Sequence, residues 1–194
     1  MNIYHYINLI EEPNLRKSCQ KILDTPDFFT HPASTGIHHG YVGGLLVHTL
    51  EVLDYTVALS KAFPQTDLDI LIASALWHDY AKIWDYKLIT YFNGQDLPKY
   101  HVLSKDEEYY KKAYVADLEY KNKIHHVTGS TAEFTAAAIS AGVSRETIQK
   151  VQHCIIGHHG RKDWGSIKEP QTLEAWLLHS ADYASAHFGP RKDK

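Results

Sequence analysis

Histidine and aspartate side chains that can bind a metal recur in this chain where helical spacing turns them inward. The stretch ALWHDYAK, residues 75–82, places His78 and Asp79 at the end of an apolar pattern that repeats every three to four residues. A carboxylate buried without a partner is strongly unfavourable. Asp79 therefore predicts an opposing positive charge, and a divalent cation shared with other side chains would supply it.

Further candidate ligands come from separate parts of the sequence. His48 lies on the apolar face of a helix expected over about 43–63, and Asp182 is embedded in the apolar stretch EAWLLHSADYASA. His158 and His159 directly follow an apolar run that ends in glycine. Each histidine alone is more often a hydrogen-bonded core residue than a ligand. Together they indicate side chains that several helices carry to one place, as in metal-binding bundles.

The ligand types predict one or two divalent ions. The chain has 14 histidines but only two cysteines, Cys19 and Cys154. Two cysteines are too few for a disulfide framework or a thiolate site, and we expect both to be reduced. Nitrogen and oxygen ligands suit Mn²⁺, Fe²⁺, Ni²⁺ or Zn²⁺. The candidates outnumber the ligands of one tetrahedral ion. Two ions bridged by a carboxylate are a common arrangement for hydrolysing phosphate esters.

The elements that must position these residues are predicted to be mostly helical. An exception is the segment of about 86–103, where β-forming residues flank Asn93 and Gly94, a hairpin signal. The fold class is therefore all-α with a small β-hairpin insertion. The expected helices cover residues 2–11, 14–23, 43–63, 67–83, 104–121, 127–141, 144–157 and 170–187.

Composition places the chain among ordinary globular proteins. It has 194 residues, of which 44% are hydrophobic and 22% charged, with a net charge of −3. This charge gives no general attraction to nucleic acid or to a membrane surface. No segment has the roughly 18 apolar residues of a membrane span, and the first residues lack a signal-peptide pattern. We expect a cytoplasmic location and no membrane partner, and the oligomeric state stays open.

Four stretches carry a resemblance to a known family. The residues His48, His78, Asp79 and Asp182 resemble the H…HD…D signature of the HD-domain metal-dependent phosphohydrolases, an all-α superfamily. The stretches PASTGIHHGYVGGLLVHTLEV, ALWHDYAKI, GHHGRKDWGS and EAWLLHSAD are similar to the branch of bacterial 3′–5′ exoribonucleases and conjugation-associated HD proteins. The resemblance implies an HD-domain helical bundle. The length of the chain predicts a single domain over 1–194, with N-terminal helices in 1–30 and the HD core, which carries the resemblance, in 32–187.

The resemblance also implies a ligand set. A second ion would be held by His125 and the pair His158-His159, with Asp79 as the bridge. His126 competes with His125 because the doublet blurs the spacing to the following glycine, and His125 is favoured. The ligands implied for the first ion are His48, His78, Asp79 and Asp182.

Other residues are candidates for the substrate side. Lys82 follows Asp79 by three residues and could hold a phosphate oxygen as a catalytic residue, or be a surface lysine. His38 and His39 could line the mouth of the site or cap a helix, and Arg161 could contact phosphate. His179, one turn before Asp182, could orient a ligand. A further group could stack on bases or simply pack: Tyr109, Tyr110, Tyr114 and Tyr120.

The expected reaction is hydrolysis of a phosphate ester or anhydride, and the resemblance implies a nucleotide or a nucleic-acid 3′ end as substrate. A phosphodiesterase or exonuclease is the main prediction. Two alternatives stay open: a phosphohydrolase acting on monomeric nucleotides, and a regulatory protein that binds a nucleotide without turnover. Ala81 departs from the family, which often has glycine at this position.

Overall fold

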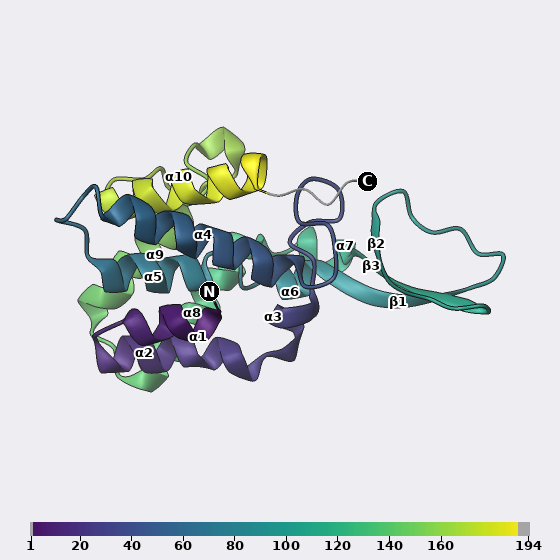
Figure 1. Ribbon diagram of the computed structural model, residues 1–194, viewed down its shortest axis with the longest axis horizontal. Coiled ribbons are helices and arrows are strands. Elements are labelled where there is room, and N and C mark those ends of the chain that lie inside the picture. Colours follow the sequence, from purple (N-terminus) through teal and green to yellow (C-terminus); the bar gives the residue numbers. More distant parts are fainter. Residues whose placement is uncertain (1, 190–194) are drawn as a thin grey trace.

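Helices make up most of the chain between residues 2 and 189, the part that the computed structural model describes (Figure 1). The helices before the sheet are α1 (Ile3–Leu9), α2 (Pro13–Gln20), α3 (Pro26–Thr30), α4 (Gly44–Ser60), α5 (Leu68–Trp77) and α6 (Lys82–Asp85). Those after it are α7 (Leu118–Lys121), α8 (His126–Ala141), α9 (Arg145–Gly157) and α10 (Leu173–Phe188). The all-α prediction is confirmed.

Helix α5 is the centre of the helical body. Its residues from Ile70 to Trp77 are all buried, because the sequence LDILIASALW is apolar on every side. It contacts helices α1, α2, α4, α8, α9 and α10. The residues that follow α5, beginning with His78 and Asp79, therefore lie inside the molecule and not at its surface.

The helix predicted over 67–83 ends earlier, at Trp77, and a tight turn leads into α6. The turn packs against α8: the Ala81 amide donates to Ser130 Oγ at 3.0 Å. A Cβ placed on Gly129 would lie 2.7 Å from the Ala81 Cβ, so only glycine fits opposite this methyl group. The methyl group of Ala81 is accommodated by the missing side chain of Gly129.

A three-stranded antiparallel sheet projects from one end of the helical body (Figure 1). It consists of β1 (Tyr86–Phe92), β2 (His101–Asp106) and β3 (Tyr110–Ala116), and β3 lies in the middle. Tyr86 pairs with Ala116 across β1 and β3, and His101 pairs with Val115 across β2 and β3.

The sheet corrects two details of the predicted insertion. Asn93 and Gly94 do form a turn, but β1 pairs with β3 and not with β2. The helix predicted over 104–121 is mostly strand, and only α7 at its end is helical. Charged residues suggested a surface helix there. Lys111 and Lys112 instead lie within a half-buried central strand in which Ala113 and Tyr114 are buried.

The N-terminal helices α1 and α2 both contact α5, which supports the proposal that residues 1–30 and the later helices form one domain. Both Cys19 and Cys154 are buried free thiols. Among the described helices, none combines the length and apolar character that crossing a membrane requires.

Candidate metal centre

Three helices bring the four residues of the H…HD…D pattern together. His48 lies in the second turn of α4, Asp182 lies in α10, and His78 and Asp79 follow the end of α5. These helices pack against one another. One ligand atom from each of the four residues lies within 4.8 Å of all the others. The first ligand set, as we name these four residues, is thus assembled by packing of the core.

The nitrogens and oxygens of the first ligand set converge at short distances. His48 Nε2 lies 3.0 Å from Asp182 Oδ1 and 3.4 Å from Asp79 Oδ2. The Nε2 atoms of His48 and His78 are 3.3 Å apart. Burial alone would lower the pKa of His48, but Asp182 and Asp79 hold it above the usual value.

Hydrogen bonds to Nδ1 orient the imidazoles. His78 Nδ1 donates to the carbonyl of Ala75 at 2.8 Å, and His158 Nδ1 donates to that of Ile155 at 2.7 Å. His48 Nδ1 lies 2.9 Å from Ser185 Oγ, which itself donates to a carboxylate. Each ring therefore keeps its Nε2 lone pair for the site, as a histidine that binds a metal requires.

A second ligand set lies on the other side of Asp79. It consists of His126, the first residue of α8, and of His158 and His159 at the end of α9. His126 Nε2 lies 3.4 Å and His158 Nε2 3.7 Å from Asp79 Oδ1. The two carboxylate oxygens of Asp79 thus face two different sets of ligand atoms, since Oδ2 faces the first set.

The preference for His125 over His126 does not agree with this geometry. His125 is the N-cap of α8, and its Nδ1 accepts a hydrogen bond from the Val127 amide at 3.3 Å. Its ring stacks on that of His126, with 4.5 Å between the ring centroids. The helix begins between the two histidines, so the side chain of His126 turns toward Asp79 and that of His125 does not.

The buried polar atoms test whether these residues fit a cation. Asp79 Oδ1 and the Nε2 atoms of His126 and His158 are buried and have no hydrogen-bond partner among the described residues. Buried polar atoms are normally paired, and leaving one unpaired costs about 1–3 kcal/mol. Carboxylate oxygens and imidazole nitrogens are ligands for divalent transition metals. The residues therefore fit the metal that the sequence predicts.

Lys82 supplies the nearest cation among the described residues. Its Nζ lies 2.5 Å from Asp79 Oδ2, and the lysine is buried. Burial alone would raise the pKa of Asp79, but Lys82 and His78 hold it well below the usual value. A buried lysine at this position is not a solvated surface residue and can reach a ligand at the site.

The loop before α4 places its two histidines differently. His38 lines a cavity of about 340 Å³ together with Lys82, His126 and His159. His39 is turned inward, where its Nε2 lies 3.1 Å from a carboxylate oxygen of Glu51. The mouth of the site therefore contains His38 but not His39.

Close packing fixes the loop that carries His39. His39 has a left-handed backbone with φ of 47°, and a Cβ at Gly44 would overlap its carbonyl oxygen. The glycine pair Gly43-Gly44 thus allows the loop to lie on the start of α4.

Two residues near the site were missed by the sequence reasoning. Glu51 Oε2 accepts a hydrogen bond from Ser185 Oγ at 2.7 Å, and Ser185 holds His48. A signal was present, because Glu51 follows His48 by three residues and Ser185 follows Asp182 by three residues. Positions three apart lie on one face of a helix.

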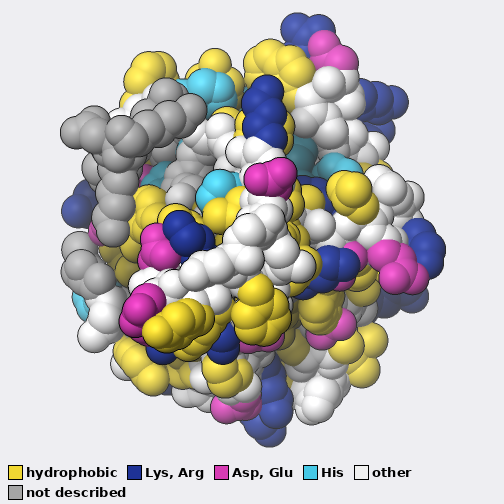
Figure 2. Space-filling view, turned by 90° about the vertical axis from the view of Figure 1, so that its right-hand side faces the viewer, with side chains coloured by type: hydrophobic (Ala, Val, Ile, Leu, Met, Phe, Trp, Pro, Cys, Tyr) yellow, Lys and Arg dark blue, Asp and Glu magenta, His cyan; other side chains and the backbone are white. Residues whose placement is uncertain are grey.

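The remaining candidates lie around the second ligand set. His179 Nδ1 donates to the His158 carbonyl at 2.8 Å, a contact that suits the predicted orienting role. Arg161 is 63% exposed at its side chain and pairs with Asp163 at 2.9 Å. It does not line the cavity that contains Lys82. Histidine side chains are visible among lysines and arginines at the end of the molecule where the sheet projects (Figure 2).

Comparison with known proteins agrees with this site. The family profile of the HD domain matches residues 45–187. The chain is 28% identical over 186 residues to the 3′–5′ exoribonuclease YhaM of Geobacillus sp. (strain WCH70). The aligned region covers 95% of this chain and 50% of that protein. The chain thus spans about half the length of this relative. The comparison with solved structures found no match for this chain. Because this family profile covers most of the chain, the chain belongs to the HD-domain family.

Proposed function

We propose that this protein hydrolyses the phosphodiester bond at the 3′ end of a nucleic acid, at a centre of two divalent ions bridged by Asp79. One observation carries the proposal: Asp79 Oδ2 faces the first ligand set, and Oδ1 faces the second. The similarity to an exoribonuclease supports RNA as the substrate. The proposed ligands are His48, His78, Asp79, Asp182, His126, His158 and His159.

In this reaction water adds to phosphorus, and the bond from phosphorus to the preceding 3′ oxygen breaks. The terminal nucleotide leaves with a 5′-phosphate, and the freed 3′ oxygen gains a proton. Divalent ions at such a site polarise the phosphate and make water a stronger nucleophile near neutral pH. The chain itself orients the ligands through Ser185 and the carbonyls of Ala75 and Ile155.

The charged groups at the mouth suit a phosphate. Lys82, Lys121 and His38 line the same cavity of about 340 Å³. We propose that Lys82 binds a non-bridging phosphate oxygen and offsets the negative charge that develops in the transition state. Lys121 lies 3.4 Å from Asp85 and is partly exposed, so it can contact phosphate nearer the solvent.

A monomeric nucleotide is the second candidate substrate. The net charge of −3 offers no broad attraction for a long polyanion, and the cavity at the metal centre is small. Both observations favour a substrate with a single phosphate group. The two candidates share the ligands and Lys82, and they differ only in what leaves from phosphorus.

The test begins with the metal content of the purified protein. The metal is then removed with a chelator, and Mn²⁺, Fe²⁺, Ni²⁺ or Zn²⁺ is added back. Each form is assayed with 3′-labelled RNA and DNA, mononucleotides and cyclic dinucleotides, with Asp79→Ala as the inactive control. We expect nucleoside 5′-monophosphates to be released from RNA 3′ ends.

Hydrolysis of mononucleotides without attack on RNA would select the second candidate. A protein that binds no metal and has no activity with any added ion would contradict both. Activity that survives Asp79→Ala unchanged would also contradict both.

A further inference from the structure

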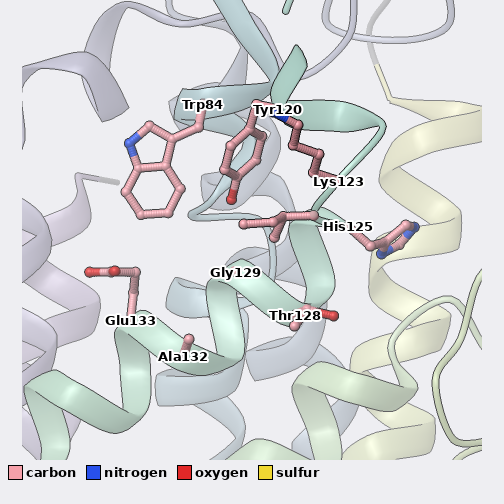
Figure 3. Close-up of a pocket in the computed structure, with 9 residues that line it drawn as sticks. Trp84, Tyr120, Lys123, His125, Thr128, Gly129, Ala132 and Glu133 are labelled. Atoms are coloured by element: carbon pink, nitrogen blue, oxygen red, sulfur yellow. The ribbon is translucent and has the colours of Figure 1, made fainter. Parts of the chain in front are cut away.

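A second cavity, of about 490 Å³, lies beside the metal centre (Figure 3). Trp84 and Tyr120 stand on one side of it, and the start of α8 forms the other side. We name it the Trp84 cavity. Its lining includes Trp84, Tyr120, Lys123, Ile124, His125, Gly129 and Glu133.

The Trp84 cavity adjoins the cavity at the metal centre. Ile124 and His125 line both. The His125 ring stacks on that of His126, whose Nε2 lies 3.4 Å from Asp79. A ligand whose phosphate lies beside Lys82 can therefore extend past His125 into the Trp84 cavity.

The aromatic walls suit a flat, apolar ligand. The indole of Trp84 is 36% exposed, and its centroid lies 5.8 Å from that of Tyr120. A Cβ on Gly129 would lie 2.7 Å from the Tyr120 hydroxyl, so the glycine lets the tyrosine approach α8. Exposed aromatic faces beside a phosphate site are the usual platform for stacking nucleobases.

We propose that the Trp84 cavity binds the nucleobase of the nucleotide whose phosphate is held at the metal centre. This inference rests on the proposed function and adds a subsite to it. The phosphate end of the site contains Lys82 and Lys121. The base end contains aromatic rings, one carboxylate and Lys123, which forms an ion pair with Glu119 at 3.1 Å. A cationic end and an aromatic end match the two ends of a nucleotide.

Glu133 gives the cavity a preference among bases. Its side chain lies below the indole of Trp84 at the edge of the cavity (Figure 3). Within residues 2–189, no lysine, arginine or histidine forms an ion pair with the Glu133 carboxylate; Lys123, which also lines the cavity, is paired with Glu119. A carboxylate only accepts hydrogen bonds. Guanine presents two neighbouring donors, N1–H and the N2 amino group, so guanine is the base that matches Glu133 best.

The test measures binding of 5′-GMP, 5′-UMP, ribose 5-phosphate and inorganic phosphate to the metal-loaded protein by calorimetry. Because stacking strengthens binding, we expect GMP to bind about tenfold more tightly than ribose 5-phosphate. Trp84→Leu removes this difference. Trp176→Leu, at an exposed tryptophan of α10 that lines none of these cavities, retains it. Circular dichroism checks the fold of each variant.

Two further measurements separate base binding from a structural role. GMP quenches tryptophan fluorescence in the wild type and in Trp176→Leu but not in Trp84→Leu. Glu133→Gln preserves the shape of the side chain and lowers the preference for GMP over UMP by about tenfold. It also decides the question of base preference if Trp84→Leu fails to fold.

Equal affinities for GMP and ribose 5-phosphate in the wild type would overturn the inference. A folded Trp84→Leu variant that keeps the difference, or a Glu133→Gln variant with unchanged base preference, would do so too. These failures are distinct from failure of the proposed function. If only the proposed function failed, the protein would bind GMP through its base but hydrolyse no phosphate ester with any metal.

Discussion

The two ligand sets around Asp79 are built in different ways. The first set comes from the interior of the helical bundle, where α4 and α10 each contribute a residue from within the helix and His78 and Asp79 follow the buried helix α5. The second set comes from helix ends: His126 begins α8, and His158 and His159 follow α9. Residues in the middle of packed helices are held by the whole core, whereas those at helix ends depend on the local backbone.

The two sets also differ in charge. The first set contains two carboxylates, Asp79 and Asp182, and the second contains three imidazoles that share only Asp79 Oδ1. Burial lowers the pKa of His126 and His158 well below the usual value, so both are neutral. Because carboxylates attract a cation more strongly than neutral rings do, we expect the first set to bind its ion more tightly.

Substitution at Asp79 should break both sets. In Asp79→Asn, the single negative charge that the two sides of the proposed bridge share is removed at nearly constant volume. We expect kcat/KM to fall by more than about 100-fold, because loss of outer partners alone costs 10–100-fold at metal sites. Metal content and steady-state kinetics measure the effect. Asp163→Asn, at an exposed carboxylate, is the matched control. A variant with normal metal content would contradict the bridging role.

Substitutions in the histidine doublet should show which of its two residues belongs to the second ligand set. We expect His126→Ala to lose the more weakly held ion and about tenfold or more in activity. His125→Ala should retain both ions, because its ring does not face Asp79. Metal analysis of the two variants side by side checks the assignment. Loss of metal in His125→Ala alone would restore the preference derived from the sequence.

Ser185 offers a way to weaken the first set alone. In Ser185→Ala, His48 loses the hydrogen bond that orients its Nδ1, and Glu51 loses a donor. We expect the affinity for the first ion to fall about tenfold while the second set keeps its geometry. Competition with a chelator measures the affinity. Ser180→Ala, on the exposed side of α10, serves as the control.

Arg161 should have the smallest effect. Its guanidinium is exposed and paired with Asp163, and exposed pairs contribute about 0–1 kcal/mol. We expect Arg161→Ala to change KM and kcat by less than about twofold. A larger rise in KM would show that Arg161 reaches the phosphate after substrate binds, as its sequence position beside the histidine pair suggested.

The sequence by itself determined which residues approach the core. Apolar periodicity placed His48, Asp79 and Asp182 on inward faces, and helical spacing is regular enough for such an inference. It could not choose between His125 and His126, because the position where α8 begins decides which ring turns inward. The sequence also predicted a helix over residues 104–121. Most of these residues form strands instead, because pairing with distant strands outweighs the local charge pattern of β3.

Only the tertiary structure decided how the ligand atoms are shared. The sequence predicted Asp79 as a bridge through resemblance, but the separate directions of its two oxygens follow from the packing of α4, α8, α9 and α10 around the end of α5. The same packing placed Ser185 behind His48 and the Trp84 cavity beside His126. A local pattern fixes which face of a helix is buried, whereas the contacts across that face depend on where the other helices lie.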